Sequence, residues 1–176
     1  MRFAVLIVAF LMSTSAWADL YLEPYVGYLE SIDDSSVTAS GVTLSGKANY
    51  HGVIYGGKLG AEYSLLAVGG DFLGGSLQGG GASTNIQNFG AFVQISLPLL
   101  IKLSGSYYFS GKETSNGITG TGTGFKIGFG FDIIPYLSLN FDYLSMNYDK
   151  LSGSGVSAGY DKVTGGIASI SIPISL

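Results

Sequence analysis

The chain contains one histidine, His51, whose imidazole is the side chain best suited to act as a general base near neutral pH. A base of this kind needs a nucleophile and an orienting partner within hydrogen-bond reach. Asp33 with Ser35 or Ser36 could approach it in space, but there is no His-x-Ser pair, and the chain has no cysteine to provide a thiolate. We therefore predict no catalytic residues.

The adjacent acids Asp33 and Asp34 are candidate calcium ligands. A dedicated calcium loop places its oxygen ligands at alternating positions, however, and this segment does not. The glycine-rich stretches 79–81 and 120–124 do not open a helix, as a phosphate-binding loop requires. Both features are interpreted as polar or flexible loops. We predict no metal site and no cofactor.

The N-terminal residues resemble an export signal. Arg2 precedes an unbroken apolar run over residues 3–12, and Ala16 and Ala18 flank Trp17 in an A-x-A pattern. This layout is typical of a secretory signal peptide, and the apolar run is too short for a spanning helix. We predict that residues 1–18 are a cleaved signal peptide and that residues 19–176 form one domain.

The composition is unusual for a soluble protein. Only 11% of the residues are charged, against about 25% in an average soluble domain, and the mean hydropathy is +0.39. The absence of cysteine excludes a disulfide-stapled fold and a lipid-anchored lipoprotein. The formal net charge of −4 gives no positive footprint for nucleic acid, so no nucleic-acid partner is expected.

Bulky apolar side chains alternate with small or charged ones along most of the chain, as in residues 125–133. This period of two is typical of strands whose faces meet different environments. We predict eight strands, at residues 20–30, 52–63, 66–77, 86–97, 101–112, 124–133, 137–148 and 163–176. Each is long enough to cross the apolar core of a membrane, which takes about ten tilted residues.

The predicted connections alternate in length. Residues 64–65, 98–100 and 134–136 are short turns, whereas residues 31–51, 78–85, 113–123 and 149–162 are longer and polar. In transmembrane barrels the short turns are periplasmic. We therefore predict an all-β fold, an eight-stranded antiparallel up-and-down transmembrane β-barrel in the bacterial outer membrane, with both termini periplasmic.

The two faces of the strands have different predicted surroundings. The polar face is mostly small residues and suits a crowded interior, so the apolar face is expected to meet lipid. Aromatic residues near the long loops would form an interfacial girdle: Tyr55, Phe89, Phe109, Phe125 and Tyr143. Charged residues of inward parity are predicted to form a structural ion-pair network: Glu23, Lys58, Glu62, Asp71, Lys102, Lys126, Asp132 and Asp142. A proton or ion path is the alternative, although so small a barrel leaves no aqueous channel.

The sequence EPYVGY over residues 23–28 opens the first predicted strand, and the alternating IASISIPISL ends the chain. With the signal peptide, these features resemble the small outer-membrane β-barrel family that includes OmpX and the OmpA transmembrane domain. The resemblance implies that the last strand is read by the barrel-assembly machinery during insertion. That strand usually ends in phenylalanine, and Leu176 departs from this pattern. The resemblance implies no substrate.

Four lysines lie at or above the predicted outer rim, where they could contact lipopolysaccharide phosphates: Lys47, Lys112, Lys150 and Lys162. The expected partners are therefore outer-membrane lipids and lipopolysaccharide, with the assembly machinery during insertion. The leading hypothesis is a non-enzymatic surface barrel that supports envelope integrity or presents loops for adhesion or recognition. The alternatives are a narrow pore or lateral conduit for small molecules, as in OmpW-like barrels, and a lipid A-modifying enzyme centred on His51.

Overall fold

The computed structural model describes residues 18–39, 42–79, 81–98, 100–134, 136–152 and 158–176. Apart from Ala18, the predicted signal peptide lies outside these residues. The strands are β1 (Asp19–Ala39), β2 (Val42–Tyr63), β3 (Leu66–Gly79), β4 (Ala82–Leu97), β5 (Ile101–Ser115), β6 (Ile118–Ile134), β7 (Leu137–Ser152), β8 (Ala158–Ser171) and β9 (Ile174–Ser175). Within the described residues, no helix is long and apolar enough to cross a membrane.

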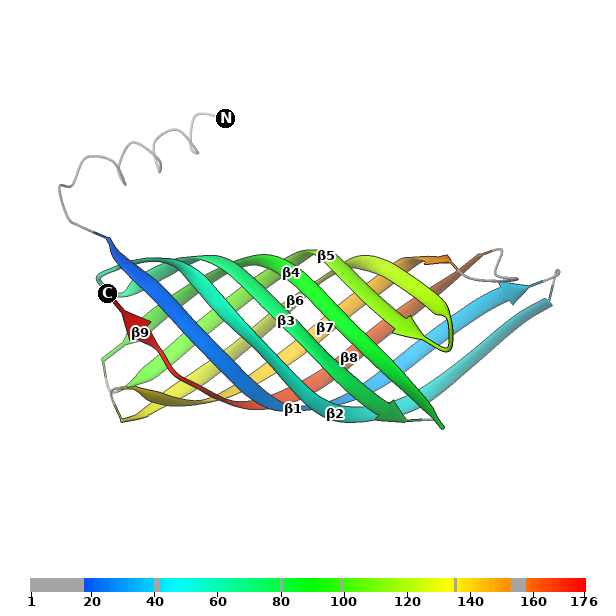
Figure 1. Ribbon diagram of the computed structural model, residues 1–176, viewed down its shortest axis with the longest axis horizontal. Helices are drawn as coiled ribbons and strands as arrows, with labels where there is room; N and C mark the ends of the chain where they lie inside the picture. Colours follow the sequence, from blue (N-terminus) through cyan, green and yellow to red (C-terminus); the bar gives the residue numbers. More distant parts are fainter. Residues whose placement is uncertain (1–17, 40–41, 80, 99, 135, 153–157) are drawn as a thin grey trace, which may run out of the picture.

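The sheet closes on itself. From β1 to β8 each strand pairs antiparallel with the next in sequence, β1 also pairs with β8, and the short β9 pairs with β1. Tyr25 thus has Gly56 of β2 on one side and Ser171 of β8 on the other. Figure 1 shows the resulting barrel of tilted strands. The prediction of an all-β, eight-stranded antiparallel barrel is confirmed, because closure leaves no unpaired edge strand.

The strands are longer than predicted, and the predicted long loops are mostly strand. The β1–β2 pairing runs from Asp19 opposite Glu62 as far as Ala39 opposite Val42, across most of the predicted loop 31–51. The β5–β6 hairpin turns at Asn116-Gly117, where both residues have positive φ (48° and 79°), as an Asn-Gly hairpin turn requires. Continued pairing satisfies backbone groups that a loop would leave to water. Residues 153–157 of the predicted loop 149–162 lie outside the described residues.

The last predicted strand, 163–176, is interrupted. β8 ends at Ser171 and β9 begins at Ile174, because Pro173 has no amide hydrogen to donate to the ladder. Pairing with β1 continues across the break: the Ile172 amide donates to Pro24 O (3.0 Å), and Leu176 exchanges backbone hydrogen bonds with Leu20. The start of β1 and the C-terminus therefore lie at the same end of the barrel (Figure 1).

The two ends of the barrel differ in their connections. The turn end carries the connections at residues 64–65, 98–100 and 135–136 together with the start of β1 and the C-terminus, and the hairpin end carries the other four connections. The predicted faces are confirmed, since apolar side chains cover the outer wall while Lys58, Asp71 and Lys126 are buried inside. All five girdle aromatics point outward. Tyr55, Phe72, Phe89 and Phe109 follow one another across the wall with ring centroids 6.3–6.4 Å apart.

Candidate functional site

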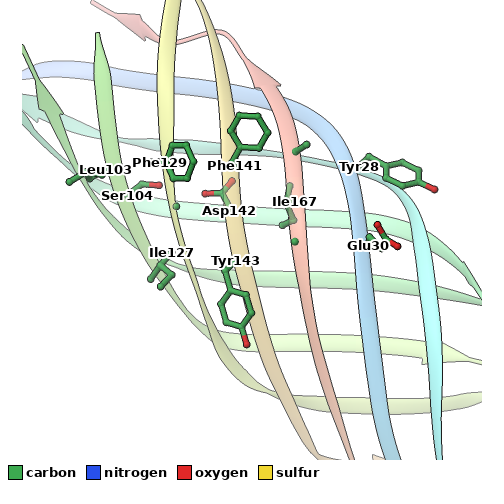
Figure 2. Close-up of a pocket in the computed structure, with 13 residues that line it drawn as sticks. Tyr28, Glu30, Leu103, Ser104, Ile127, Phe129, Phe141, Asp142, Tyr143 and Ile167 are labelled. Carbon is green, nitrogen blue, oxygen red and sulfur yellow. The ribbon is translucent and has the colours of Figure 1, made fainter. Parts of the chain in front are cut away.

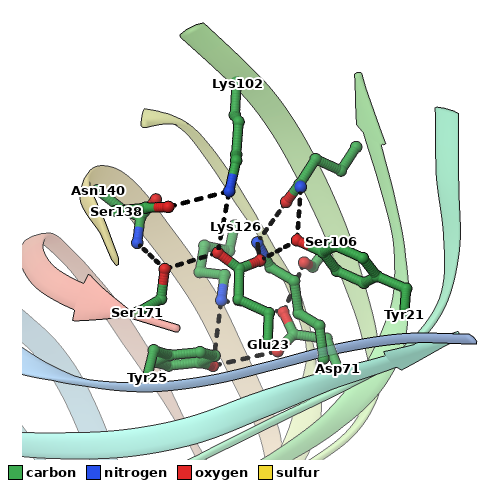
Figure 3. Close-up of polar contacts among 12 residues, drawn as sticks. Tyr21, Glu23, Tyr25, Asp71, Lys102, Ser106, Lys126, Ser138, Asn140 and Ser171 are labelled. Atoms are coloured by element: carbon green, nitrogen blue, oxygen red, sulfur yellow. Dashed lines mark hydrogen bonds and ion pairs between the residues drawn. The ribbon is translucent and has the colours of Figure 1, made fainter. Parts of the chain in front are cut away.

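The interior near the turn end is held together by a closed group of polar side chains. Lys58 Nζ lies 3.1 Å from Glu23 Oε2 and donates to Gln94 Oε1 at 2.9 Å. Gln94 Nε2 donates to the Tyr21 hydroxyl at 2.7 Å, which in turn donates to Glu23 at 2.7 Å. Ser171 Oγ donates to the other Glu23 oxygen at 2.6 Å, so both carboxylate oxygens accept hydrogen bonds (Figure 3).

A second group lies deeper and is centred on Asp71, which has no exposed surface. Lys126 Nζ is 2.9 Å from Asp71 Oδ2. Three hydroxyls also donate to this carboxylate: Ser106 (2.6 Å), Tyr108 (2.9 Å) and Tyr25 (3.1 Å). The lysine completes the group by lying over the Tyr25 ring, 4.5 Å from its centroid. Hydrogen bonds and a cation therefore replace the water that a buried carboxylate loses.

The third lysine, Lys102, joins the wall of β5 to the turn end of β6 and β7. Its Nζ lies 2.7 Å from Asp132 Oδ1, donates to Ser138 Oγ at 2.9 Å and is 4.0 Å from Glu23 Oε1. Ser138 also donates to Asp132. The Lys102–Asp132 pair is less buried than the Lys58–Glu23 and Lys126–Asp71 pairs, because the Asp132 side chain is 21% exposed.

Six of the eight residues predicted for the interior network thus form the three pairs Glu23–Lys58, Asp71–Lys126 and Asp132–Lys102. Glu62 lies apart, at the turn end, where it accepts a hydrogen bond from Ser175. Asp142 is half-buried on β7 and lies outside the three pairs. Such an arrangement fills and braces the lumen, and it leaves each of the three lysines with a carboxylate.

Above this network, toward the hairpin end, the interior is mainly apolar, a feature that was not predicted from the sequence. The buried residues of this apolar plug are Tyr25, Leu29, Ile54, Leu73, Leu77, Ile86, Tyr108, Leu144, Met146, Tyr148, Val163 and Ile167. Leu144, Met146 and Tyr148 lie at alternate positions of β7, so their inward direction could be predicted from the sequence. In this half of the strands, however, residues of the lipid-facing side are apolar as well, and the two faces cannot be told apart by hydrophobicity. These side chains fill the lumen above the ion pairs, together with buried Asn88, which accepts a hydrogen bond from the Tyr148 hydroxyl at 3.2 Å.

Three acids meet at the hairpin end, beyond the apolar plug. Asp33 of β1, Glu113 of β5 and Asp161 of β8 each offer a carboxylate oxygen within 4.8 Å of the other two. They line a cavity of about 170 Å³ with Tyr50. Each acid has an outward charged neighbour in its strand, namely Asp34 beside Asp33, Lys112 beside Glu113 and Lys162 beside Asp161, so the cluster lies beyond the uncharged stretch of the outer wall.

The acids of this mouth cluster, Asp33, Glu113 and Asp161, strongly affect one another. Burial and the negative charge of Asp33 raise the pKa of Glu113 to about 7. Burial, a hydrogen bond with Asp33 and the charges of Glu113 and Asp33 raise the pKa of Asp161 to about 9. No motif in the sequence marks this cluster, because its members are distant in sequence and meet only when β1, β5 and β8 are placed around one barrel.

The four rim lysines point outward at the hairpin end, as exposed side chains. Lys47 and Lys162 flank Asp34 on the two neighbouring strands, and Lys47 Nζ lies 3.2 Å from Asp34 Oδ2. Lys112 and Lys150 flank Thr121 in the same way. The lysines therefore form two rows on the outer wall.

His51 is not at the base of a loop, as the sequence suggested, but within β2. Its side chain is exposed on the outer wall, stacked on Tyr28 with ring centroids 6.2 Å apart, and it lies opposite Glu30 in the ladder. Asp33 is buried inside the barrel. The two are therefore on opposite faces of the wall, and the structure does not bring His51 together with Asp33, the carboxylate considered for it in the sequence.

A groove of about 680 Å³ runs along the lipid-facing wall over β5–β8 and β1. Phe129, Phe141 and Tyr143 project beside it, with Asp142 between them on the wall (Figure 2). Gly166 leaves room in the groove, because a Cβ at this position would have no other atom within 4 Å. Glu30 and Ser104 also line it, but most of the lining is apolar, so lipid acyl chains match it chemically.

No protein-family model matches the sequence, and no curated protein matches it. Solved structures match in fold. Neisserial surface protein A has a TM-score of 0.52 at 12% identity, covering 89% of this chain and 99% of that one. Ail of Yersinia pestis has a TM-score of 0.52 at 14% identity, covering 88% and 98%. OprG of Pseudomonas aeruginosa has a TM-score of 0.50 at 12% identity, covering 90% and 97%. This chain thus has the fold of the small eight-stranded outer-membrane β-barrels.

Proposed function

We propose that the protein is a non-enzymatic barrel of the bacterial outer membrane, with a structural or surface role. In this proposal residues 1–18 are a cleaved signal peptide, both termini are periplasmic and the hairpin end faces the outside. The observation that carries it is the combination of an exposed apolar wall with an interior closed by three ion pairs and the apolar plug. A wall of this kind is stable only in lipid.

The plugged interior favours a structural role over a pore. Ions crossing the lumen would have to separate Lys126 from Asp71 and then pass the buried apolar side chains of Leu144 and Met146. Both steps cost free energy. The first leaves a buried charge without its partner, and the second places an ion among apolar side chains. An eight-stranded barrel is in any case just wide enough for its own side chains.

The hairpin end supports a surface role. β1 and β2 have 21 and 22 residues, about twice what a tilted strand needs to cross a membrane, so their hairpin projects as a paired ribbon. The exposed rim lysines, Lys47, Lys112, Lys150 and Lys162, lie where lipopolysaccharide phosphates would be met, and each ammonium can donate to phosphate oxygens. Envelope integrity, adhesion and recognition all fit such a surface.

A lateral conduit for small apolar molecules is the second candidate, and the groove beside Phe129 and Tyr143 is the observation that favours it. A solute in the groove would have to enter the lumen past Asp142. Ile167 and Leu144 fill the interior at that level. The groove is therefore better suited to binding a lipid acyl chain than to passing a solute into the lumen.

Conductance in a planar lipid bilayer tests the proposal. Purified, refolded protein is expected to give no conductance steps, whereas a trimeric porin measured in the same cell gives large ones. A strain that lacks the protein should show altered envelope sensitivity to detergent and unchanged uptake of small solutes. Regular conductance steps, or a specific uptake defect that the wild-type protein restores, would favour the conduit instead.

A further inference from the structure

The mouth cluster is assembled from three strands. β1 and β8 are neighbours in the barrel, whereas β5 reaches the cluster from the opposite wall, three strands away from β8. Oxygens of Asp33, Glu113 and Asp161 nevertheless lie within 4.8 Å of one another. Three carboxylates at this separation repel one another strongly unless protons or a cation lie between them.

Burial makes this arrangement unusual. Asp33 and Glu113 are each only 6% exposed. Asp33 Oδ1, Glu113 Oε2 and Asp161 Oδ1 are buried and accept no hydrogen bond from any described residue. Among the described residues, none of the three forms an ion pair either, in contrast to Glu23, Asp71 and Asp132 inside the barrel. Buried carboxylate oxygens of this kind normally have a partner.

We propose that Asp33, Glu113 and Asp161 bind a calcium ion at the hairpin end of the barrel. The donor set is entirely oxygen, which selects a hard cation over the transition metals that favour nitrogen or sulfur. Three oxygens that bind one Ca²⁺ at 2.3–2.6 Å lie up to about 4.5 Å from one another, so carboxylates within 4.8 Å of one another are close enough to share one ion with little movement.

The surrounding cavity can complete the coordination shell. Calcium takes six to eight oxygen ligands and tolerates irregular geometry, whereas magnesium requires a near-ideal octahedron. Ser35, Ser115 and Asn116 line the same cavity of about 170 Å³ and offer further oxygens, and the cavity has room for water ligands. The geometry points to calcium rather than magnesium for this reason.

The site also explains why the Asp33-Asp34 pair failed as a sequence motif. The two side chains lie on opposite faces of β1, with Asp33 inside the barrel and Asp34 outside beside Lys47. The three ligands come from opposite walls of the barrel, β1 and β8 on one side and β5 on the other, and not from one loop. A bound ion would therefore tie β5 to β1 and β8 across the mouth and hold the projecting hairpins in one arrangement.

Calcium binding is measured by isothermal titration of CaCl₂ into the refolded protein in detergent micelles free of lipopolysaccharide, because lipopolysaccharide itself binds divalent cations. We expect one saturable site per chain and a higher melting temperature with calcium. Glu113→Gln and Asp33→Asn should each weaken binding by at least about tenfold, since each removes one of three ligand charges. Terbium luminescence sensitised by Tyr50, which lines the cavity, gives a second readout.

Asp34→Asn is the matched control, because it removes an acid from the adjacent position on the outer face. It should leave the affinity within about twofold of wild type, as an exposed neighbouring charge contributes little. A heat-modifiable band on unboiled gels confirms that each variant is folded. Absence of saturable binding to the wild-type protein, equal loss in Asp34→Asn and Glu113→Gln, or tighter binding of magnesium than of calcium would each overturn the proposal.

Discussion

The ammonium group of Lys126 lies 2.9 Å from Asp71 Oδ2 and 4.5 Å from the centre of the Tyr25 ring, with both charged residues almost wholly buried. Asp71 is contributed by β3 and Lys126 by β6, so the pair joins opposite walls of the barrel. It also marks the level at which the polar interior gives way to the apolar plug. The ion pair therefore braces the centre of the interior, together with the hydroxyl groups of Ser106 and Tyr108 that also reach Asp71.

Lys126→Met should destabilise the barrel strongly. It leaves Asp71 buried without its cation, and breaking a buried pair typically costs about 3–5 kcal/mol. Urea unfolding in detergent measures the effect. The double variant Lys126→Met/Asp71→Leu should recover much of the loss, because no unpaired charge remains. Equal stability of wild type and Lys126→Met would contradict the pairing.

Lys102→Leu should lower the urea midpoint by a smaller amount than Lys126→Met. Its partner Asp132 has a side chain that is 21% exposed, so water can replace part of the lost interaction. The prediction concerns the order of the two urea midpoints, with that of Lys126→Met below that of Lys102→Leu. A larger effect at Lys102 would mean that the turn end, and not the centre, bears the critical ion pair.

Phe129→Lys should block membrane insertion, whereas Gly130→Ser should be tolerated. Phe129 faces lipid, where a lysine near mid-membrane depth costs about 2–4 kcal/mol. A side chain at position 130 points inward and meets the end of the flexible Asn140 side chain, which can move aside. The fraction of protein with heat-modifiable mobility in membrane fractions measures both. Equal tolerance at the two positions would mean that the faces are assigned wrongly.

Replacing Lys112 and Lys150 with glutamine should weaken binding of the refolded protein to lipopolysaccharide and reduce its salt dependence. Both lysines are exposed, and an exposed ammonium binds phosphate mainly by charge. Lys47→Gln should have a smaller effect, because Asp34 already neutralises Lys47 at 3.2 Å. If the double variant binds lipopolysaccharide vesicles as well as wild type does, Lys112 and Lys150 do not recognise lipopolysaccharide phosphates.

His51→Ala should leave folding, insertion and lipid A composition as in wild type. The imidazole is exposed on the outer wall and stacks on Tyr28, away from the interior acid Asp33. Mass spectra of lipid A from cells with the wild-type and variant proteins check this expectation. An acyl-chain change that depends on His51 would identify an envelope-remodelling enzyme.

The sequence was sufficient for the fold because alternation carries most of the information. In β6, Phe125, Ile127 and Phe129 alternate with inward Lys126, and this period specifies both strand and face. The strand ends were harder to predict. Asn116-Gly117 is a strong hairpin signal, yet the surrounding threonines and glycines resemble a loop until the partner strand is in place.

The interior could be predicted only in part. Parity identifies Lys126 and Asp71 as inward residues, but their contact depends on the tilt and stagger of β3 and β6 across the barrel. The mouth cluster is harder still, because Asp33 and Glu113 are far apart in sequence and share no motif. Their proximity is a property of barrel closure and cannot be read from either strand alone.

Epitope accessibility on intact cells tests the central claim most directly, namely that the barrel lies in the outer membrane with its hairpin end outside. A tag inserted between Asn116 and Gly117 should bind antibody on intact cells, whereas one between Ser64 and Leu65 should bind only after permeabilisation. Both tagged proteins should remain heat-modifiable, because the closed strand ladder resists detergent. Antibody binding at 64–65 on intact cells, with none at 116–117, would contradict the account.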